Sequence, residues 1–105
     1  MKLVRWTDED GYTRQVLTRS TSTDEQAIQF GIPLDPPSLA EFSIPEAVKK
    51  DIHNELIARD LVSWADVLAQ QSGVTALVGV VARRHQLNRW EARQLRRDLL
   101  SAFRR

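Results

Sequence analysis

Arg89, Arg93 and Arg97 stand at every fourth position near the end of the sequence. If this stretch is an α-helix, that spacing places the three side chains on one face, and at about 100° per residue Arg96 and Arg104 fall on the same flank. Like charges four residues apart destabilise a helix by roughly 0.2–0.5 kcal/mol per pair, so the arrangement has a cost. The guanidinium group is planar and can bind phosphate or carboxylate through two hydrogen bonds at once. The spacing therefore predicts a face that follows a chain of phosphates.

The positive charge is concentrated at this end of the chain. Residues 83–105 contain eight arginines against two acidic residues, a net charge of +6, whereas residues 1–82 carry −5 and the whole chain only +1. This asymmetry favours an anionic partner, either a nucleic acid or an acidic protein surface. The alternative is an ordinary solvated helix flank whose arginines are partly neutralised by the acidic half of the molecule. The total charge of +1 also argues against strong non-specific binding.

Trp90 is the tryptophan of this basic segment, and on a helical wheel it lies nearly opposite Ala92 and Phe103. An exposed tryptophan beside arginines can stack on a nucleic-acid base or anchor a protein partner. The alternative is that Trp90 covers another helix or the N-terminal hairpin. The residues that we predict to bind nucleic acid or a partner are Arg83, Arg84, Arg89, Trp90, Arg93, Arg96 and Arg97.

The last two predicted helices also have the layout of a helix-turn-helix, with a short turn at residues 85–88 between an apolar helix and a basic one. Gln86 stands where this turn usually has glycine, which weakens the match. In such motifs, residues near the start of the second helix contact the bases, and here these are Arg89, Trp90 and Arg93. Any pair of short amphipathic helices can imitate this pattern.

Residues suited to catalysis or metal binding are few. The chain has no cysteine, which excludes disulfides and thiolate metal sites, and only two histidines. His53 has Ile57 rather than a second ligand four residues later. The acidic run Asp8–Gly11 lacks the ligand spacing of a calcium loop, so we interpret it as a turn. Without a glycine-rich phosphate loop or a nucleophile motif, we predict a protein that is not an enzyme and holds no metal or cofactor.

The N-terminal segment is predicted to form a β-hairpin. Two stretches rich in β-branched and aromatic residues flank the run Asp8–Gly11, in which aspartate favours a type I turn and glycine a left-handed residue. A three-residue loop would pair Trp6 with Arg14 and place Val4 and Val16 on one face. Because an isolated hairpin is only marginally stable in water, we expect this face to pack against the helices.

Residues 19–43 are predicted to be a polar, proline-rich linker or strap. The first half is rich in serine and threonine, and three prolines between residues 33 and 37 remove hydrogen-bond donors and fix φ. A connection of this length is unusual inside a compact domain. It is expected to be either partly disordered or an extended strap that contacts the helices through Phe30, Ile32 and Leu34.

Four helices are predicted in the second half of the chain, at residues 44–60, 64–71, 74–85 and 89–103. Three of them begin with a serine or asparagine followed three residues later by an acid, at Ser43, Ser63 and Asn88, which is the pattern of a capping box. The segment 74–82 is apolar on nearly all sides, which predicts the central buried helix. A buried strand is the alternative, because β-branched residues dominate this segment.

Together these features predict an α+β fold that is mostly α: a hairpin at residues 1–18, the linker at 19–43 and a helical bundle at 44–105, all in one domain with a modest core. No stretch approaches the roughly 18 apolar residues of a membrane span, so we expect a cytoplasmic protein without a membrane partner. We expect a non-catalytic regulatory or accessory module that contacts nucleic acid through its basic C-terminal helix. The alternative is a protein-protein adaptor or assembly subunit that uses the basic helix and the hairpin edge, and that forms a homodimer if the apolar helix is not covered internally.

Overall fold

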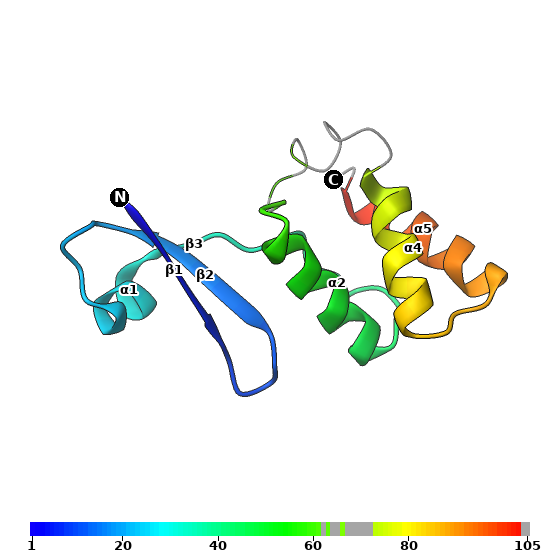
Figure 1. Ribbon diagram of the computed structural model, residues 1–105, viewed down its shortest axis with the longest axis horizontal. Coiled ribbons are helices and arrows are strands. Elements are labelled where there is room, and N and C mark those ends of the chain that lie inside the picture. The colour runs from blue at the N-terminus through cyan, green and yellow to red at the C-terminus, as the bar shows by residue number, and fades with distance from the viewer. Residues whose placement is uncertain (62, 64–65, 67–72, 104–105) are drawn as a thin grey trace. The chain divides into compact units, whose positions relative to one another are not determined.

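The computed structural model describes residues 1–61, 63, 66 and 73–103, and the chain divides into two compact units, Met1–Asp35 and Pro36–Arg105 (Figure 1). The first unit contains the strands β1 (Lys2–Thr7), β2 (Thr13–Thr18) and β3 (Ile32–Pro33) and the helix α1 (Asp24–Phe30). The second contains the helices α2 (Glu46–Ala58), α4 (Gly73–Arg84) and α5 (Arg89–Phe103). The prediction of an α+β fold with more helix than strand is therefore confirmed.

β1 and β2 form the predicted hairpin in the predicted register, with Trp6 opposite Arg14 and Val4 opposite Val16. In the turn between them, the amide of Gly11 donates to the carbonyl of Asp8 at 3.1 Å, and Gly11 has a φ of 87°. This left-handed conformation is open to glycine and strained for most other residues, which explains the glycine at the end of the turn.

The side chain of Asp8 holds the same turn together. Its Oδ1 accepts hydrogen bonds from the amides of Asp10 at 2.9 Å and Tyr12 at 3.0 Å, and its Oδ2 accepts one from Arg14 Nε at 3.0 Å. Desolvation by itself would raise the pKa of Asp8, but these hydrogen bonds stabilise the carboxylate and bring the pKa below its ordinary value of 3.8. The interpretation of the acidic run as a turn is confirmed.

Residues 24–33 have regular structure, so the prediction of an irregular linker is wrong for this stretch. α1 begins with a capping box in which the Gln26 amide donates to Thr23 Oγ1 at 3.2 Å and the Thr23 amide donates to Gln26 Oε1 at 2.9 Å. β3 then pairs antiparallel with β2 and adds a third strand to the sheet, in the order β1-β2-β3. Pro33 is tolerated because β3 lies at an edge of this sheet.

α1 packs against β1 and β2 within the first unit. Ala27 is fully buried, and Val16 is 4% exposed. A Cβ atom on Gly31, at the end of α1, would lie only 2.8 Å from Val16 Cβ, so the backbone passes too close to β2 to carry a side chain there. The hairpin therefore packs against a helix of its own unit that the sequence analysis did not predict.

The core of the second unit is formed by apolar residues that recur at helical spacing. On α2 the buried residues are Val48, Ile52, Leu56 and Ile57. α2 begins at Glu46 because Pro45 occupies the N-cap, where no side-chain hydrogen bond caps the helix. The predicted capping box at Ser43 is therefore wrong, since this serine lies two residues before the N-cap.

α4 is a helix over the apolar segment, which excludes the alternative of a strand. Its buried residues are Val74, Leu77, Val78 and Val81. Thr75 and Ala76 are exposed, and a Cβ atom on Gly79 would meet no atom within 4 Å. The prediction of a helix buried on nearly all sides is wrong, because α2 and α5, the described elements that pack against α4, cover one side of it.

α4 and α2 end in the same backbone motif. After α4, Gln86 has a φ of 52° and the Leu87 amide donates to the carbonyl of Ala82 at 2.9 Å. After α2, Asp60 has a φ of 57° and the Leu61 amide donates to the carbonyl of Leu56 at 2.8 Å. The left-handed residue of this motif is usually glycine. Gln86 thus adopts the left-handed conformation that glycine usually supplies at a helix end, although it is not glycine.

The helix predicted at residues 64–71 lies outside the described residues, apart from Asp66. The capping box predicted for its start is present. The Ser63 amide donates to Asp66 Oδ2 at 3.3 Å, and the Asp66 amide donates to Ser63 Oγ at 3.2 Å. These reciprocal bonds satisfy two backbone donors at a helix start.

Candidate functional site

The capping box at the start of α5 and its buried face fix which of its side chains point toward solvent. The Glu91 amide donates to Asn88 Oδ1 at 2.8 Å and the Asn88 amide donates to Glu91 Oε1 at 3.1 Å, which confirms the predicted capping box. Leu95, Leu99 and Phe103 are buried in the core of the second unit. Because the buried side chains recur at intervals of four residues, the opposite face of α5 is turned outward.

Trp90 projects from the outward face of α5 and is 72% exposed. The prediction that it faces away from the core is confirmed, and the alternative that it is buried against another helix of the second unit is wrong. The other large apolar side chains that are exposed among the described residues all lie in the first unit. Among the described residues of the second unit, Trp90 is therefore an exception to the burial of large apolar side chains, which makes it a candidate binding residue.

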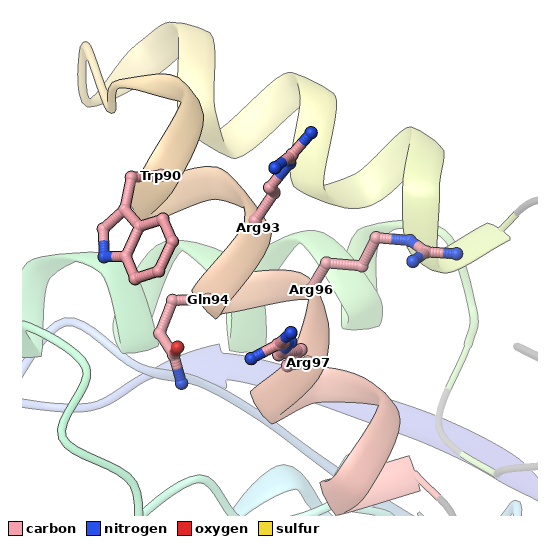
Figure 2. A pocket seen from close by; sticks show the side chains of 5 residues that line it. All are labelled: Trp90, Arg93, Gln94, Arg96 and Arg97. Atoms are coloured by element: carbon pink, nitrogen blue, oxygen red, sulfur yellow. The ribbon is translucent and has the colours of Figure 1, made fainter.

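Three arginines and a glutamine line the same cleft as Trp90. Together they line an open cleft of about 290 Å³, which we call the basic cleft; its residues are Trp90, Arg93, Gln94, Arg96 and Arg97. In Figure 2, Trp90 and Gln94 lie on one side and Arg96 on the other, with the remaining two arginines between them. No acidic residue is part of this lining, so nothing in it offsets the three positive charges.

The arginines of α5 have no acidic partner among the described residues. The side chains of Arg89, Arg93 and Arg97 take part in no hydrogen bond or ion pair within that part of the chain. Arg96 Nε donates to the neutral hydroxyl of Thr75 at 3.3 Å, which joins α5 to α4 without cancelling the charge. These cations therefore stay available for charge-assisted hydrogen bonds to an anionic ligand.

Arg84 differs from these arginines because acidic residues of α2 pair with it. Its Nη1 donates to Asp51 Oδ1 at 2.7 Å and to Glu55 Oε2 at 3.0 Å. The hydrogen bonds to Glu55 and Asp51 raise the pKa of Arg84 further. Asp51 Oδ2 also lies 2.9 Å from His85 Nε2. Arg84 thus belongs to an ion-pair cluster within the second unit rather than to a free basic surface.

The residues singled out from the sequence are only partly brought together. Those that line the basic cleft are Trp90, Arg93, Arg96 and Arg97. Arg89 is exposed at the start of α5 but does not line the cleft. Arg83 Nε donates to the carbonyl of Gly79 on its own helix at 3.2 Å. Within the second unit, acids of α2 therefore neutralise Arg84, whereas no described acidic residue of that unit pairs with the α5 arginines.

A second cleft, of about 310 Å³, borders the first, and we call it the apolar cleft. Its lining includes the apolar residues Ile44, Val48, Leu87 and Leu95 and the acids Glu91 and Asp98. Trp90 and Gln94 line both clefts. On α5 the two acids fall on the opposite flank of Trp90 from Arg93, so the helix separates a positive side from an apolar and acidic one.

Gln94 and the apolar cleft were missed by the sequence analysis. Gln94 stands four residues after Trp90, so helical spacing could have identified it as a neighbour. Ile44 and Val48 carry no comparable signal in the sequence. Ile44 lies just before α2 and Val48 lies within it, and only the tertiary fold brings them beside α5.

Other kinds of site have little support among the described residues. No group of three or more His, Cys, Asp or Glu side chains there could hold a metal ion. No helix in that part of the chain is long and apolar enough to cross a membrane. Asp8 and Arg84 have clearly shifted pKa values, and neither lines the basic cleft or the apolar cleft. What the two clefts offer a ligand is positive charge, hydrogen-bonding groups and an aromatic face.

Comparison with known proteins assigns this chain to no family. No protein-family model matches it, and no curated protein or solved structure matches it significantly. The case for a function therefore rests on the residues of the two clefts.

Proposed function

We propose that this protein is a small, non-catalytic regulatory or accessory module that binds nucleic acid through the basic cleft and Arg89. The observation that carries the proposal is an exposed indole beside arginines that have no acidic partner among the described residues. Arginine binds phosphate oxygens in a bidentate manner, and tryptophan stacks on bases. The cytoplasmic location and the lack of catalytic activity remain predictions from the sequence.

The spacing of the arginines suits a chain of phosphates. Arg89, Arg93 and Arg97 are separated by four residues each, which is about 6 Å along a helix axis. One strand of B-DNA advances about 3.4 Å per phosphate along the duplex axis, so this interval is close to two phosphates for a helix that lies along that axis. Each phosphate that a cation neutralises releases counterions, which makes the affinity depend on salt. Contacts of this kind hold the ligand without reading its sequence.

The turn between α4 and α5 supports a helix-turn-helix-like arrangement. Gln86 supplies the left-handed residue of that turn. Arg89, Trp90 and Arg93 lie at the start of α5, which is where residues of a second helix contact bases in the major groove. Recognition of a DNA duplex in this way remains a prediction.

Binding can be tested by fluorescence anisotropy with labelled duplex DNA and single-stranded RNA at low and near-physiological salt. We expect saturable binding that weakens with salt and is lost when Arg89, Arg93 and Arg97 are all replaced with glutamine. Replacing the exposed Arg19 of the first unit with glutamine is the control and should change little. If the protein is folded by circular dichroism and binds neither ligand at low salt, the proposal is refuted.

A second candidate function, a protein-protein adaptor or assembly subunit, is supported by the apolar surface of the first unit. Phe30 is 76% exposed and Ile32 58% exposed. β1 has β2 on one side and no strand of the described sheet on the other, and an edge of this kind can accept a further strand. Sedimentation of the wild type and of Phe30→Ser/Ile32→Ser tests self-association: a dimer that the double variant loses supports this role. A monomer at every concentration refutes the homodimer.

A further inference from the structure

Trp90 forms a wall of both the basic cleft and the apolar cleft. A ligand that fills both must carry negative charge on one side of the indole and a flat, mainly apolar group on the other. A nucleotide has this composition, because a sugar joins its phosphate to its base. We propose that the ligand is a single-stranded nucleic acid, one base of which lies against Trp90 in the apolar cleft while its flanking phosphates lie in the basic cleft. The inference rests on the proposed function and specifies its ligand.

The exposure of Trp90 favours a single strand over a duplex. A base in a duplex has both of its faces covered by its neighbours, so a protein in the major groove meets only base edges. Single strands expose the faces of their bases, and aromatic side chains stack on them. An indole that is 72% exposed, beside arginines that have no acidic partner among the described residues, provides this stacking surface next to cations for the backbone.

The apolar cleft is suited to receive the unstacked base. Its volume of about 310 Å³ is at the lower end of ligand pockets. The half-buried Leu87 and the accessible edges of the buried residues Ile44, Val48 and Leu95 form its apolar floor. A base that leaves solvent and its own stack needs contacts of this kind on the face that Trp90 does not cover.

The polar groups of the apolar cleft favour a base with an exocyclic amino group. Glu91 and Asp98 present carboxylate oxygens, which accept hydrogen bonds and donate none. Cytosine has an amino donor at the ring position where thymine and uracil have a carbonyl oxygen, and adenine has one where guanine has a carbonyl oxygen. Glu91 is held in place by its bond from the Asn88 amide, and Asp98 Oδ1 by its bond from Gln94 Nε2 at 3.2 Å. We therefore expect cytosine to be preferred to thymine.

The first test compares wild type, Trp90→Ala and Trp90→Phe by fluorescence anisotropy. The ligands are oligodeoxycytidine, oligodeoxythymidine and a duplex, each about 12 nucleotides long, which is within the usual length of a single-strand site. The loss of one stacked base lowers affinity about 5- to 150-fold, so Trp90→Ala should reduce oligodeoxycytidine binding by that factor. Trp90→Phe keeps an aromatic face and should retain most of it. Phe30→Ala, at an equally exposed aromatic residue of the first unit, is the matched control and should change nothing.

The second test concerns the base preference. Glu91→Gln preserves the capping box, because glutamine can replace glutamate there. Combined with Asp98→Asn, it removes two negative charges and should strengthen binding to all nucleic acids. The informative quantity is therefore the ratio of the affinities for oligodeoxycytidine and oligodeoxythymidine. We expect this ratio to be about 5 or more in the wild type and close to 1 in the double variant. Oligoribocytidine in parallel shows whether RNA or DNA is the tighter single strand.

The outcomes separate this inference from the proposed function. If Trp90→Ala leaves single-strand binding unchanged, or if duplex DNA binds as tightly as oligodeoxycytidine, the inference is wrong even though the arginines bind nucleic acid. If the wild type binds oligodeoxythymidine as tightly as oligodeoxycytidine, the expected preference for cytosine is wrong. Absence of binding to every ligand at low salt refutes the proposed function itself.

Discussion

Replacing Arg89, Arg93 and Arg97 with glutamine removes three of the four α5 cations that we expect to contact phosphates and leaves Arg96. If each cation neutralises one phosphate, log K plotted against log salt has a slope of about −2.8 for a single strand and −3.6 for a duplex in the wild type. In the triple variant the slopes become about −0.7 and −0.9. Between about 50 and 200 mM salt, the wild type then loses about 50- to 150-fold in affinity and the variant only about 3-fold.

The assay is a series of anisotropy titrations at increasing salt, with the same labelled ligand for each protein. Arg84→Gln is the matched control, because it makes the same change of charge in the same basic segment of the sequence. Arg84 is paired with Asp51 and Glu55, so its replacement should leave the slope unchanged. Removing like charges four residues apart should also raise the free energy of unfolding of the triple variant, by roughly 0.2–0.5 kcal/mol for each pair removed.

Two results would contradict this reasoning. An unchanged slope in the triple variant would mean that these arginines do not contact phosphates. If Arg84→Gln reduces the slope by as much per charge removed as the triple variant does, total charge rather than the free face of α5 governs binding. In the second case the ion pairs of Arg84 would be irrelevant to the affinity.

Further expectations concern the stability of the turns and of the first unit. Gln86→Gly removes the strain of a left-handed non-glycine residue and should raise the free energy of unfolding by about 1 kcal/mol, measured by urea denaturation. A decrease would contradict the strain argument. Gly31→Ala places a Cβ atom 2.8 Å from Val16 Cβ and should destabilise the first unit by about 1–3 kcal/mol. The measurement is amide hydrogen exchange, which should become faster in β1 and β2. Unchanged exchange would show that the site can relax. Desolvation of Asp8 is outweighed by its hydrogen bonds, so its folded-state pKa lies below 3.8. The stability that Asp8 contributes is therefore fully present above pH 3.8 and is lost as pH falls through the lower folded value. In thermal melts at falling pH, Asp8→Asn should flatten that loss, and an identical pH dependence in both proteins would refute the assignment.

Local rules made several elements predictable from the sequence. The hairpin register follows from the period-2 pattern and from a turn that Asp8 and Gly11 specify. The start of α5 follows from the pairing of Asn88 with Glu91, and its outward face from the period of its apolar residues. Each of these features depends on residues within about one turn or one hairpin of each other.

The errors arise where a local signal was overlooked or had a competitor. Thr23 and Gln26 have the spacing of a capping box, but nearby prolines suggested an irregular segment and α1 was missed. Ser43 has the same spacing before an acid, yet Pro45 occupies the N-cap instead. Proline fixes φ and has no amide to bond, so it suits the start of a helix even without a side-chain cap.

The sequence by itself determined that arginines share one face of α5 with Trp90, because that depends only on helical spacing. Which arginines keep their charge free was decided by tertiary structure, since Asp51 and Glu55 reach Arg84 only when α2 packs beside α4. The apolar cleft has the same origin, because Ile44 meets the α5 surface only in the folded second unit. Spacing along a helix is a local geometric property, whereas ion pairing and cavity formation depend on which helix faces are buried against each other.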